Sequence, residues 1–260
     1  MISPRSKRIA VIRCGRLLNQ HHVSTLLGYL EECGLVVSLF AIQCPAEDIE
    51  ALQLQYPSIA VIGVGEFGGN GISRFVRGGI ELRKRLRASE ADIHYIIDSW
   101  TLRYYTVAIA LPGSPHRRAV VYHTFDMLSP GVAGWHERSL ERYWARSSDL
   151  VVVTDLSRSA LMKAHYRLDT SPLALAVRMP RSFKPPEPGA LEAFRLSVLP
   201  KGTSKLVVSP TRVSPDRRGI EIIEAFSATP DDYALITYEG SPEYTTACKE
   251  AATRLKIANR

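Results

Sequence analysis

The sequence predicts an α/β protein in which helices cover both faces of a parallel sheet. Runs rich in valine and isoleucine alternate with segments of helical periodicity from the first residues onward, which is typical of βαβ units. The strand-like runs are short and apolar throughout, as expected when both faces of a sheet are buried. With 260 residues, of which 45% are apolar and 23% charged, the chain has room for one large domain or two small ones.

Six strands and five helices are predicted in the first part of the chain. The strands cover residues 8–12, 35–41, 58–62, 93–98, 119–122 and 150–154. The helices cover residues 17–33, 72–88, 102–111, 137–146 and 157–165. Gly34 follows the first helix, where glycine ends a helix by adopting a left-handed conformation, and the next strand begins at once.

A proline-rich stretch from Pro172 to Pro200 predicts a domain boundary. We therefore expect an N-terminal domain over residues 1–183, a linker over 184–204 with a short helix at 191–196, and a second domain over 205–260. The last part holds strands at 205–209 and 233–238 and helices at 219–228 and 243–256. About 60 residues are few for an independent domain, so we expect the second domain to be incomplete.

The composition excludes several classes of protein. No apolar stretch approaches the ~20 residues needed to cross a bilayer, and the N-terminal one is too short for a secretory signal, so we expect a cytoplasmic protein. The four cysteines form neither a disulfide nor a zinc pattern and are expected to remain thiols. The P-loop, GxSxG, HExxH and Asp-x-Asp motifs are missing from the sequence, which excludes P-loop kinases, α/β-hydrolases, zincins and metal-dependent sugar transferases. No metal ion and no cofactor are expected.

A net charge of +7 favours anionic partners. The densest basic cluster lies in the predicted helix 72–88, where Arg74, Arg77, Lys84 and Arg85 point away from an apolar arc. That arc consists of Ile72, Phe75, Val76, Ile80, Leu82 and Leu86. The basic face is either a solvated surface or a weak electrostatic contact with an anionic membrane. Nucleic-acid binding is not expected, because no aromatic residues interleave with the cluster and no nucleic-acid-binding motif is present.

A glycine-rich loop follows the predicted strand 58–62. Residues 63–68 match G-x-G-x-x-G, the dinucleotide fingerprint. The loop continues to Gly71, however, and Asp98 lies 33 residues beyond Gly65 where about 20 are expected. An NAD-dependent oxidoreductase is therefore a less favoured alternative.

A candidate anion site lies in the second part of the chain. Ser209 to Arg212 ends a strand, and residues 216–219 (Asp-Arg-Arg-Gly) open a helix. A strand end, a loop cation and a helix N-terminus together can bind phosphate. The alternative is that these arginines are ordinary solvated loop charges.

The segment from Lys205 to Gly240 resembles the start of the C-terminal domain of GT-B glycosyltransferases of the retaining family 4 (group 1) type. That family shows a strand, Gly-Arg, a short loop, Lys-Gly, an amphipathic helix ending in Ala-Phe and a strand closing on Gly-x-Gly. Residues 91–98, 120–126 and 148–157 resemble successive segments of its N-terminal domain. The resemblance implies a GT-B-like architecture with an N-terminal Rossmann-like domain and an incomplete second one.

The resemblance also implies roles for particular residues. Arg212 corresponds to the family arginine, and Arg218 stands where a lysine contacts the donor diphosphate, a change of geometry at the same charge. Donor binding by Gly219 and Gly240 is implied on the same basis.

On the acceptor side, His123 aligns with a histidine near the transferred sugar, which is a catalytic position; the alternative is a strand-end histidine bonded to the backbone. Gly15, Arg16 and Asp126 fall on acceptor-side loops. The family's glutamate pair would follow Arg260.

The implied activity is retaining transfer of a sugar from a UDP- or GDP-sugar to a glycan or lipid-linked acceptor in polysaccharide synthesis. The alternative is an inactive fragment that binds a glycan or a partner protein. Peripheral contact with an anionic membrane at its inner surface and a dimer through the exposed face of the incomplete domain are also expected.

Overall fold

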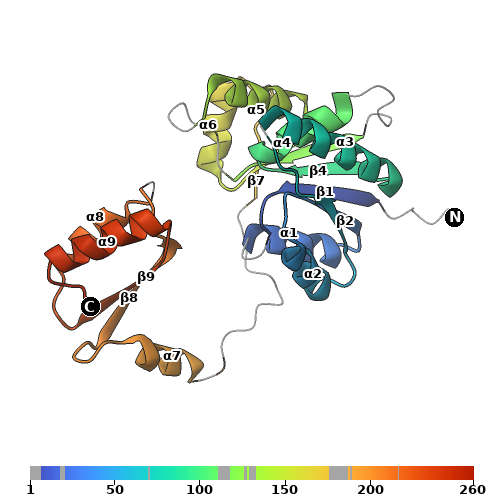
Figure 1. The fold of residues 1–260 in the computed structure, drawn as a ribbon. Coiled ribbons are helices and arrows are strands. Elements are labelled where there is room, and N and C mark those ends of the chain that lie inside the picture. Colours follow the sequence, from blue (N-terminus) through green and yellow to red (C-terminus); the bar gives the residue numbers. More distant parts are fainter. Residues whose placement is uncertain are drawn as a thin grey trace. The chain divides into compact units, whose positions relative to one another are not determined.

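The chain divides into two units, Met1–Phe183 and Lys184–Arg260 (Figure 1). The computed structural model describes residues 7–17, 21–69, 71–110, 118–125, 128, 133–175, 187, 189–215 and 217–260, with the backbone alone at residues 21 and 210–212. No helix within these ranges is both long and apolar enough to pass through a bilayer.

A seven-stranded sheet forms the centre of the first unit. Its strands are β1 (Arg8–Cys14), β2 (Val36–Ile42), β3 (Ala60–Gly65), β4 (Ile93–Ile97), β5 (Ala119–His123), β6 (Leu150–Val153) and β7 (Leu173–Ala174). Their order is β3-β2-β1-β4-β5-β6-β7, and every pair is parallel. Because each strand runs the same way, all carboxyl ends meet at one edge of the sheet.

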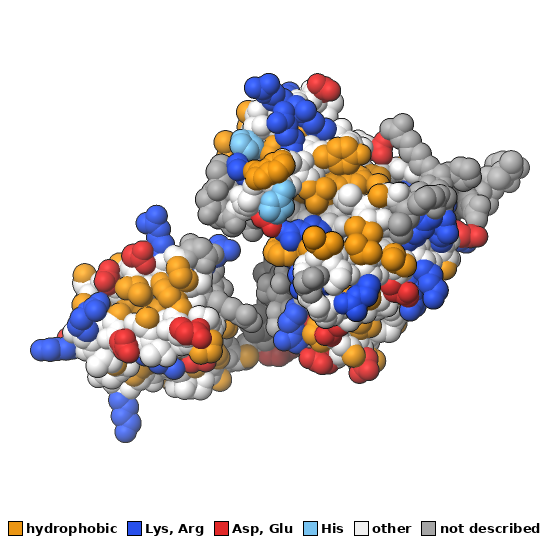
Figure 2. Space-filling model, turned by 45° about the horizontal axis from the view of Figure 1, so that its top comes forward, with side chains coloured by type: hydrophobic (Ala, Val, Ile, Leu, Met, Phe, Trp, Pro, Cys, Tyr) orange, Lys and Arg blue, Asp and Glu red, His pale blue; other side chains and the backbone are white. Residues whose placement is uncertain are grey.

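Helices cover both faces of this sheet (Figure 1). They are α1 (His21–Glu32), α2 (Ala46–Gln55), α3 (Gly71–Ser89), α4 (Ser99–Ala110), α5 (Trp135–Ser147) and α6 (Leu156–Tyr166). One apolar cluster fills the space between the sheet and α1 and α2, and a second lies beneath α3 to α6. Figure 2 shows hydrophobic side chains exposed on the first unit, beside lysine and arginine side chains.

Two elements of this unit were not predicted from the sequence. Helix α2 follows Pro45 and carries acidic residues in its first turn, but among its apolar side chains only Leu52 is fully buried. Its helical periodicity is therefore weak, and tertiary packing stabilises it. Strand β7 has two residues, and its pairing with β6 defines it.

The second unit is a smaller α/β layer. It consists of α7 (Ala190–Val198), β8 (Lys205–Arg212), α8 (Gly219–Ser227), β9 (Tyr233–Tyr238) and α9 (Pro242–Arg254). Strands β8 and β9 pair in parallel, and α8 and α9 enclose an apolar cluster against them around Ile223 and Phe226. Helix α7, which lies within the predicted linker, belongs to this unit.

Close contact between α3 and α4 positions the helix layer of the first unit. A Cβ atom at Gly78 would lie 2.6 Å from the Tyr104 ring, and one at Gly79 would lie 2.5 Å from Cβ of Val107. Both glycines are buried. The helices therefore approach closely because these two positions have no side chain.

We predict that Gly79→Ala lowers the free energy of unfolding by about 1–3 kcal/mol, because the added methyl group overlaps Val107 and the Tyr104 carbonyl oxygen. Gly28→Ala in α1 is the matched control, since a Cβ there meets no atom within 4 Å. It should stabilise the protein by up to about 1 kcal/mol. Urea unfolding of both variants tests this, and equal effects would contradict the proposed close packing.

Candidate functional site

The direction in which strands are added to the sheet reverses between β1 and β4. The chain builds β2 and β3 on one side of β1, then returns to place β4 on its other side. In open parallel sheets, ligands bind outside the carboxyl ends of the strands at such a switch point. The residues that end β1, β4 and the neighbouring β5 therefore form the candidate site.

An ion pair joins the ends of β1 and β4. Nη1 of Arg13 lies 2.7 Å from Oδ2 of Asp98, and the two side chains are 12% and 21% exposed. Asp98 has a φ of 65°, in the left-handed region that few residues other than glycine adopt. Strained backbone of this kind persists where surrounding contacts hold it, often at functional sites.

His123 ends β5 and lies beside this ion pair in the sheet. Its side chain is buried, and Nδ1 lies 2.9 Å from Oη of Tyr95 on β4. Its Nε2 atom is buried and has no hydrogen-bond partner within the described parts of the chain. Burial, with a smaller contribution from His22, lowers the pKa of His123 to about 4, so the ring is neutral at pH 7.

Backbone amides connect the end of β4 to β5 and the end of β1 to helix α4. The Asp98 amide donates to the His123 carbonyl oxygen (2.9 Å), and the Cys14 amide donates to Oγ1 of Thr101 (2.9 Å). The Phe125 ring lies between the imidazoles, with ring centroids 3.8 Å from His22 and 4.4 Å from His123. The site is therefore preorganised by contacts that do not require a ligand.

The predicted acceptor-side loop after β1 is also held in place. Gly15 has a φ of 99°, which glycine adopts without strain. Arg16 pairs with Glu47 (3.3 Å) and with the buried carboxylate of Asp48 (3.1 Å), which also accepts from the Leu17 amide (3.0 Å). Hydrogen bonding to Asp48 raises the pKa of Arg16. Arg16 thus has a structural role, and its acceptor-side role stays a prediction. Asp126 lies outside the described residues.

Two of the predicted donor-side residues, Arg218 and Gly219, lie at the start of α8. Arg218 is the N-cap of this helix, with a φ of 52° and an exposed side chain, and Arg217 precedes it, also exposed. The first amides of α8 make long bonds, from Gly219 to the Ser214 carbonyl oxygen (3.3 Å) and from Ile220 to Oη of Tyr244 (3.3 Å). Arg212 ends β8, and its side chain lies outside the described part of the structure.

Gly219 and Gly240 are both required by packing around Val213. A Cβ at Gly240 would lie 1.8 Å from the Val213 carbonyl oxygen, and one at Gly219 would lie 3.0 Å from Cβ of Val213. The Gly240 amide donates to Oγ1 of Thr245 (3.0 Å). These contacts account for both glycines without a ligand, and their role in donor binding stays a prediction.

The glycine-rich segment 63–68 was predicted to be a loop, but Gly63 and Gly65 pair with β2 and residues 63–65 end β3, so only residues 66–68 follow the strand. Strand β3 is an edge strand of the sheet in the described chain. A dinucleotide fingerprint instead follows a strand at the switch point, so that the phosphates reach a helix N-terminus there. The loops at the switch point are those after β1 and β4. The location of the glycine-rich segment at the edge strand therefore does not favour an NAD-binding site.

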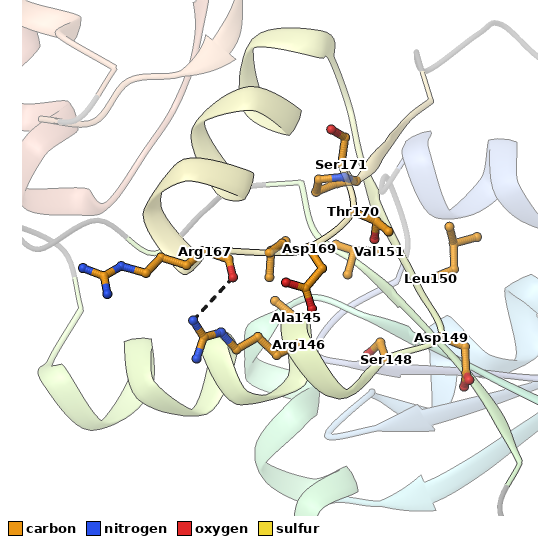
Figure 3. Close-up of a pocket in the computed structure, with 12 residues that line it drawn as sticks. Ala145, Arg146, Ser148, Asp149, Leu150, Val151, Arg167, Asp169, Thr170 and Ser171 are labelled. Atoms are coloured by element: carbon orange, nitrogen blue, oxygen red, sulfur yellow. Dashed lines mark hydrogen bonds between the residues drawn. The ribbon is translucent and has the colours of Figure 1, made fainter.

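A cavity in the described part of the first unit lies away from the switch point. It has a volume of about 410 Å³ and is formed between the end of α5, the start of β6 and the segment after α6 (Figure 3). Arg146 donates there to the Arg167 carbonyl oxygen (3.4 Å), and Asp149 accepts from the Val120 amide (2.8 Å). Because it opens at the amino end of β6, this cavity lies at the opposite edge of the sheet from His123.

Four residues of the site were not identified from the sequence as functional candidates: Arg13, Tyr95, Asp98 and Thr101. Arg13 and Asp98 carry a signal, because each is a charged residue at the end of an apolar strand. Tyr95 carries none, since an aromatic residue inside a buried strand is ordinary core.

No family model and no curated protein matches the chain. Solved structures do match it, and the chain spans about two thirds of their length. HepE from Anabaena, solved with UDP-glucose, is 16% identical over 97% of this chain and 67% of its own, with a TM-score of 0.72. Sucrose-phosphate synthase from Thermosynechococcus elongatus is 14% identical over 98% of this chain and 69% of its own, with a TM-score of 0.69.

The UDP-GlcNAc 2-epimerase from Methanocaldococcus jannaschii also matches, at 13% identity over 96% of this chain and 69% of its own, with a TM-score of 0.59. At these identities the likeness shows the fold. The predicted fold class is confirmed: the protein has a GT-B-like α/β architecture with Rossmann-like units. Because an epimerase shares it, this fold does not by itself specify one reaction.

We predict that the protein loses stability as the pH falls from about 7 to about 4. Burial lowers the pKa of both His94 and His123 from 6.5 to about 4, so over this interval the unfolded chain binds more protons than the folded one. Each histidine should contribute a loss of about 2–3 kcal/mol.

Urea unfolding at a series of pH values measures this slope. His94→Gln should flatten it, because this variant removes one of the two buried imidazoles. An equal slope in the wild type and His94→Gln would contradict the proposed effect of burial.

Proposed function

We propose that this protein transfers a sugar from a UDP- or GDP-sugar to a glycan or lipid-linked acceptor, with retention of configuration. The observation that carries the proposal is the buried, unpartnered Nε2 of His123 at the sheet's switch point, within the described chain. The GT-B-like fold supports it, because HepE, which shares the fold, was solved with UDP-glucose. A metal ion is not part of the proposed mechanism.

His123 is proposed to hold a sugar hydroxyl through Nε2. Burial raises the pKa of the Tyr95 hydroxyl, so it remains protonated and can donate to Nδ1. The proton of the neutral imidazole then lies on Nε2, which becomes a donor without a protein partner. A donor fixed in a buried site loses little freedom when it binds, and this favours a precisely placed neutral ligand group.

Arg212 and Arg218 are proposed to neutralise the departing nucleoside diphosphate. Negative charge develops on the leaving group during transfer, and guanidinium groups near a helix N-terminus stabilise it. The exposed Arg218 at the N-cap of α8 supports this role. Long hydrogen bonds at the first two amides of α8 also leave these donors able to turn to a phosphate.

Further expectations belong to the same proposal. A cytoplasmic location and contact with the inner membrane surface would bring the enzyme to a lipid-linked acceptor. Exposed Val207, Val208 and Tyr238 on β8 and β9 support self-association through the second unit. An inactive, glycan-binding form of the same fold is the second candidate, and it would bind acceptor without turnover.

We predict that UDP or GDP raises the melting temperature and that Arg212→Ala and Arg218→Ala each remove most of this shift. Loss of one charged contact to a phosphate should weaken binding about 10-fold or more. Arg254→Ala is the control, because Arg254 is an exposed arginine at the end of α9 in the same unit. No shift with either nucleotide at millimolar concentration would count against a sugar-nucleotide site.

We predict that His123→Gln lowers kcat/KM for transfer from UDP-glucose, or from the donor that the shift assay selects, by about 10–100-fold. Nucleotide binding should be unchanged, because the variant alters the first unit alone. His165→Gln serves as the control for activity, and circular dichroism checks folding. Full activity of the His123 variant would remove this residue from the mechanism.

A further inference from the structure

Helix α3 exposes a row of apolar side chains to solvent. Ile72, Val76 and Ile80 are spaced by four residues, so they form one row along the helix surface. They are 80%, 41% and 49% exposed. Neighbouring apolar side chains exposed in this way commonly mark a surface that another molecule covers.

The packing of α3 explains why this row faces outward. The helix contacts α4 through Gly78 and Gly79, and it buries Leu82 and Leu86. The sequence places Ile72, Val76 and Ile80 on one apolar arc with Leu82 and Leu86. In the structure the glycines and the two leucines form the buried side of α3, and the other three residues lie on its exposed flank.

Positive charge lies beside the apolar row. Arg77 and Lys84 are exposed and, at 100° per residue, occupy the adjacent strip of the helix surface. The one acidic residue of α3, Glu81, is paired with Arg85 at 2.8 Å. The row and its flank therefore combine aliphatic surface with net positive charge.

We propose that this face of α3 docks on an anionic lipid bilayer. An interfacial helix places apolar side chains at the boundary of headgroups and acyl chains, while its lysines and arginines meet the lipid phosphates. The net charge of +7 adds attraction to the same surface. The inference rests on the membrane contact included in the proposed function and assigns it to a surface; lipid binding can be measured apart from the transfer reaction.

A second copy of the chain fits this face less well. In a symmetric dimer through α3, the same patch would face itself. The strips that contain Arg77 and Lys84 would then lie close together, and like charges in an interface are unfavourable. An anionic bilayer offers both an apolar layer and the opposite charge.

Co-sedimentation with vesicles tests the proposal. The wild type should bind vesicles of phosphatidylcholine with about 30% phosphatidylglycerol, bind phosphatidylcholine alone weakly, and dissociate at high salt. The triple variant Ile72→Ser, Val76→Ser, Ile80→Ser should lose about 10-fold or more in partitioning. The double variant Arg77→Gln, Lys84→Gln should bind the anionic vesicles more weakly, and its binding should depend less on salt.

The matched control replaces Leu54, Leu156 and Leu161 with serine, since these side chains are exposed on α2 and α6. Its vesicle binding should equal that of the wild type, and urea unfolding should show that all variants fold. Absence of binding at low salt, or equal losses in both triple variants, would overturn the proposal. It would also be overturned if light scattering showed a dimer that the α3 variant alone abolishes.

Discussion

The ion pair between Arg13 and Asp98 connects the two strands between which the sheet reverses its direction of growth. Two charges that are largely removed from water cost free energy unless their geometry is good, and removing one partner leaves the other uncompensated. The pair therefore constrains the ends of β1 and β4, and the Asp98 amide extends the constraint to His123 on β5. The position of the candidate site depends on this connection.

The two units use different means to present polar groups. In the first, burial determines the chemistry, because the apolar surroundings keep His123 neutral and leave one of its ring nitrogens without a partner in the described structure. In the second unit, the polar groups are an exposed arginine and the backbone amides at the start of α8. Close contact of two glycines with Val213 places the end of β9 and the start of α8 side by side, and Arg218 remains exposed at the helix N-terminus.

Helix α3 links the packing of the first unit to its surface. Its glycine pair allows it to lie close to α4. With the glycine side of the helix facing α4, three aliphatic residues lie on the exposed flank. Because α3 follows β3, its first turn lies at the carboxyl edge of the sheet, the edge that also carries His123. The proposed contact of this helix with a bilayer and the proposed binding of a lipid-linked acceptor at that edge are therefore compatible within one unit.

The sequence alone determined the α/β class and most strands and helices, because these follow from local periodicity and from the order of apolar runs. His123 was selected by the resemblance to a family, and the structure places it as the last residue of β5. The sequence did not identify α2, because the apolar periodicity of this helix is weak. It also did not identify the exposed row of α3, since helical periodicity shows which residues share a face of the helix but not which element packs against that face. The pairing of Arg13 with Asp98 and of Tyr95 with His123 was decided by the tertiary structure alone. These contacts join residues 28 or more positions apart, and only the strand order of the folded sheet brings them together.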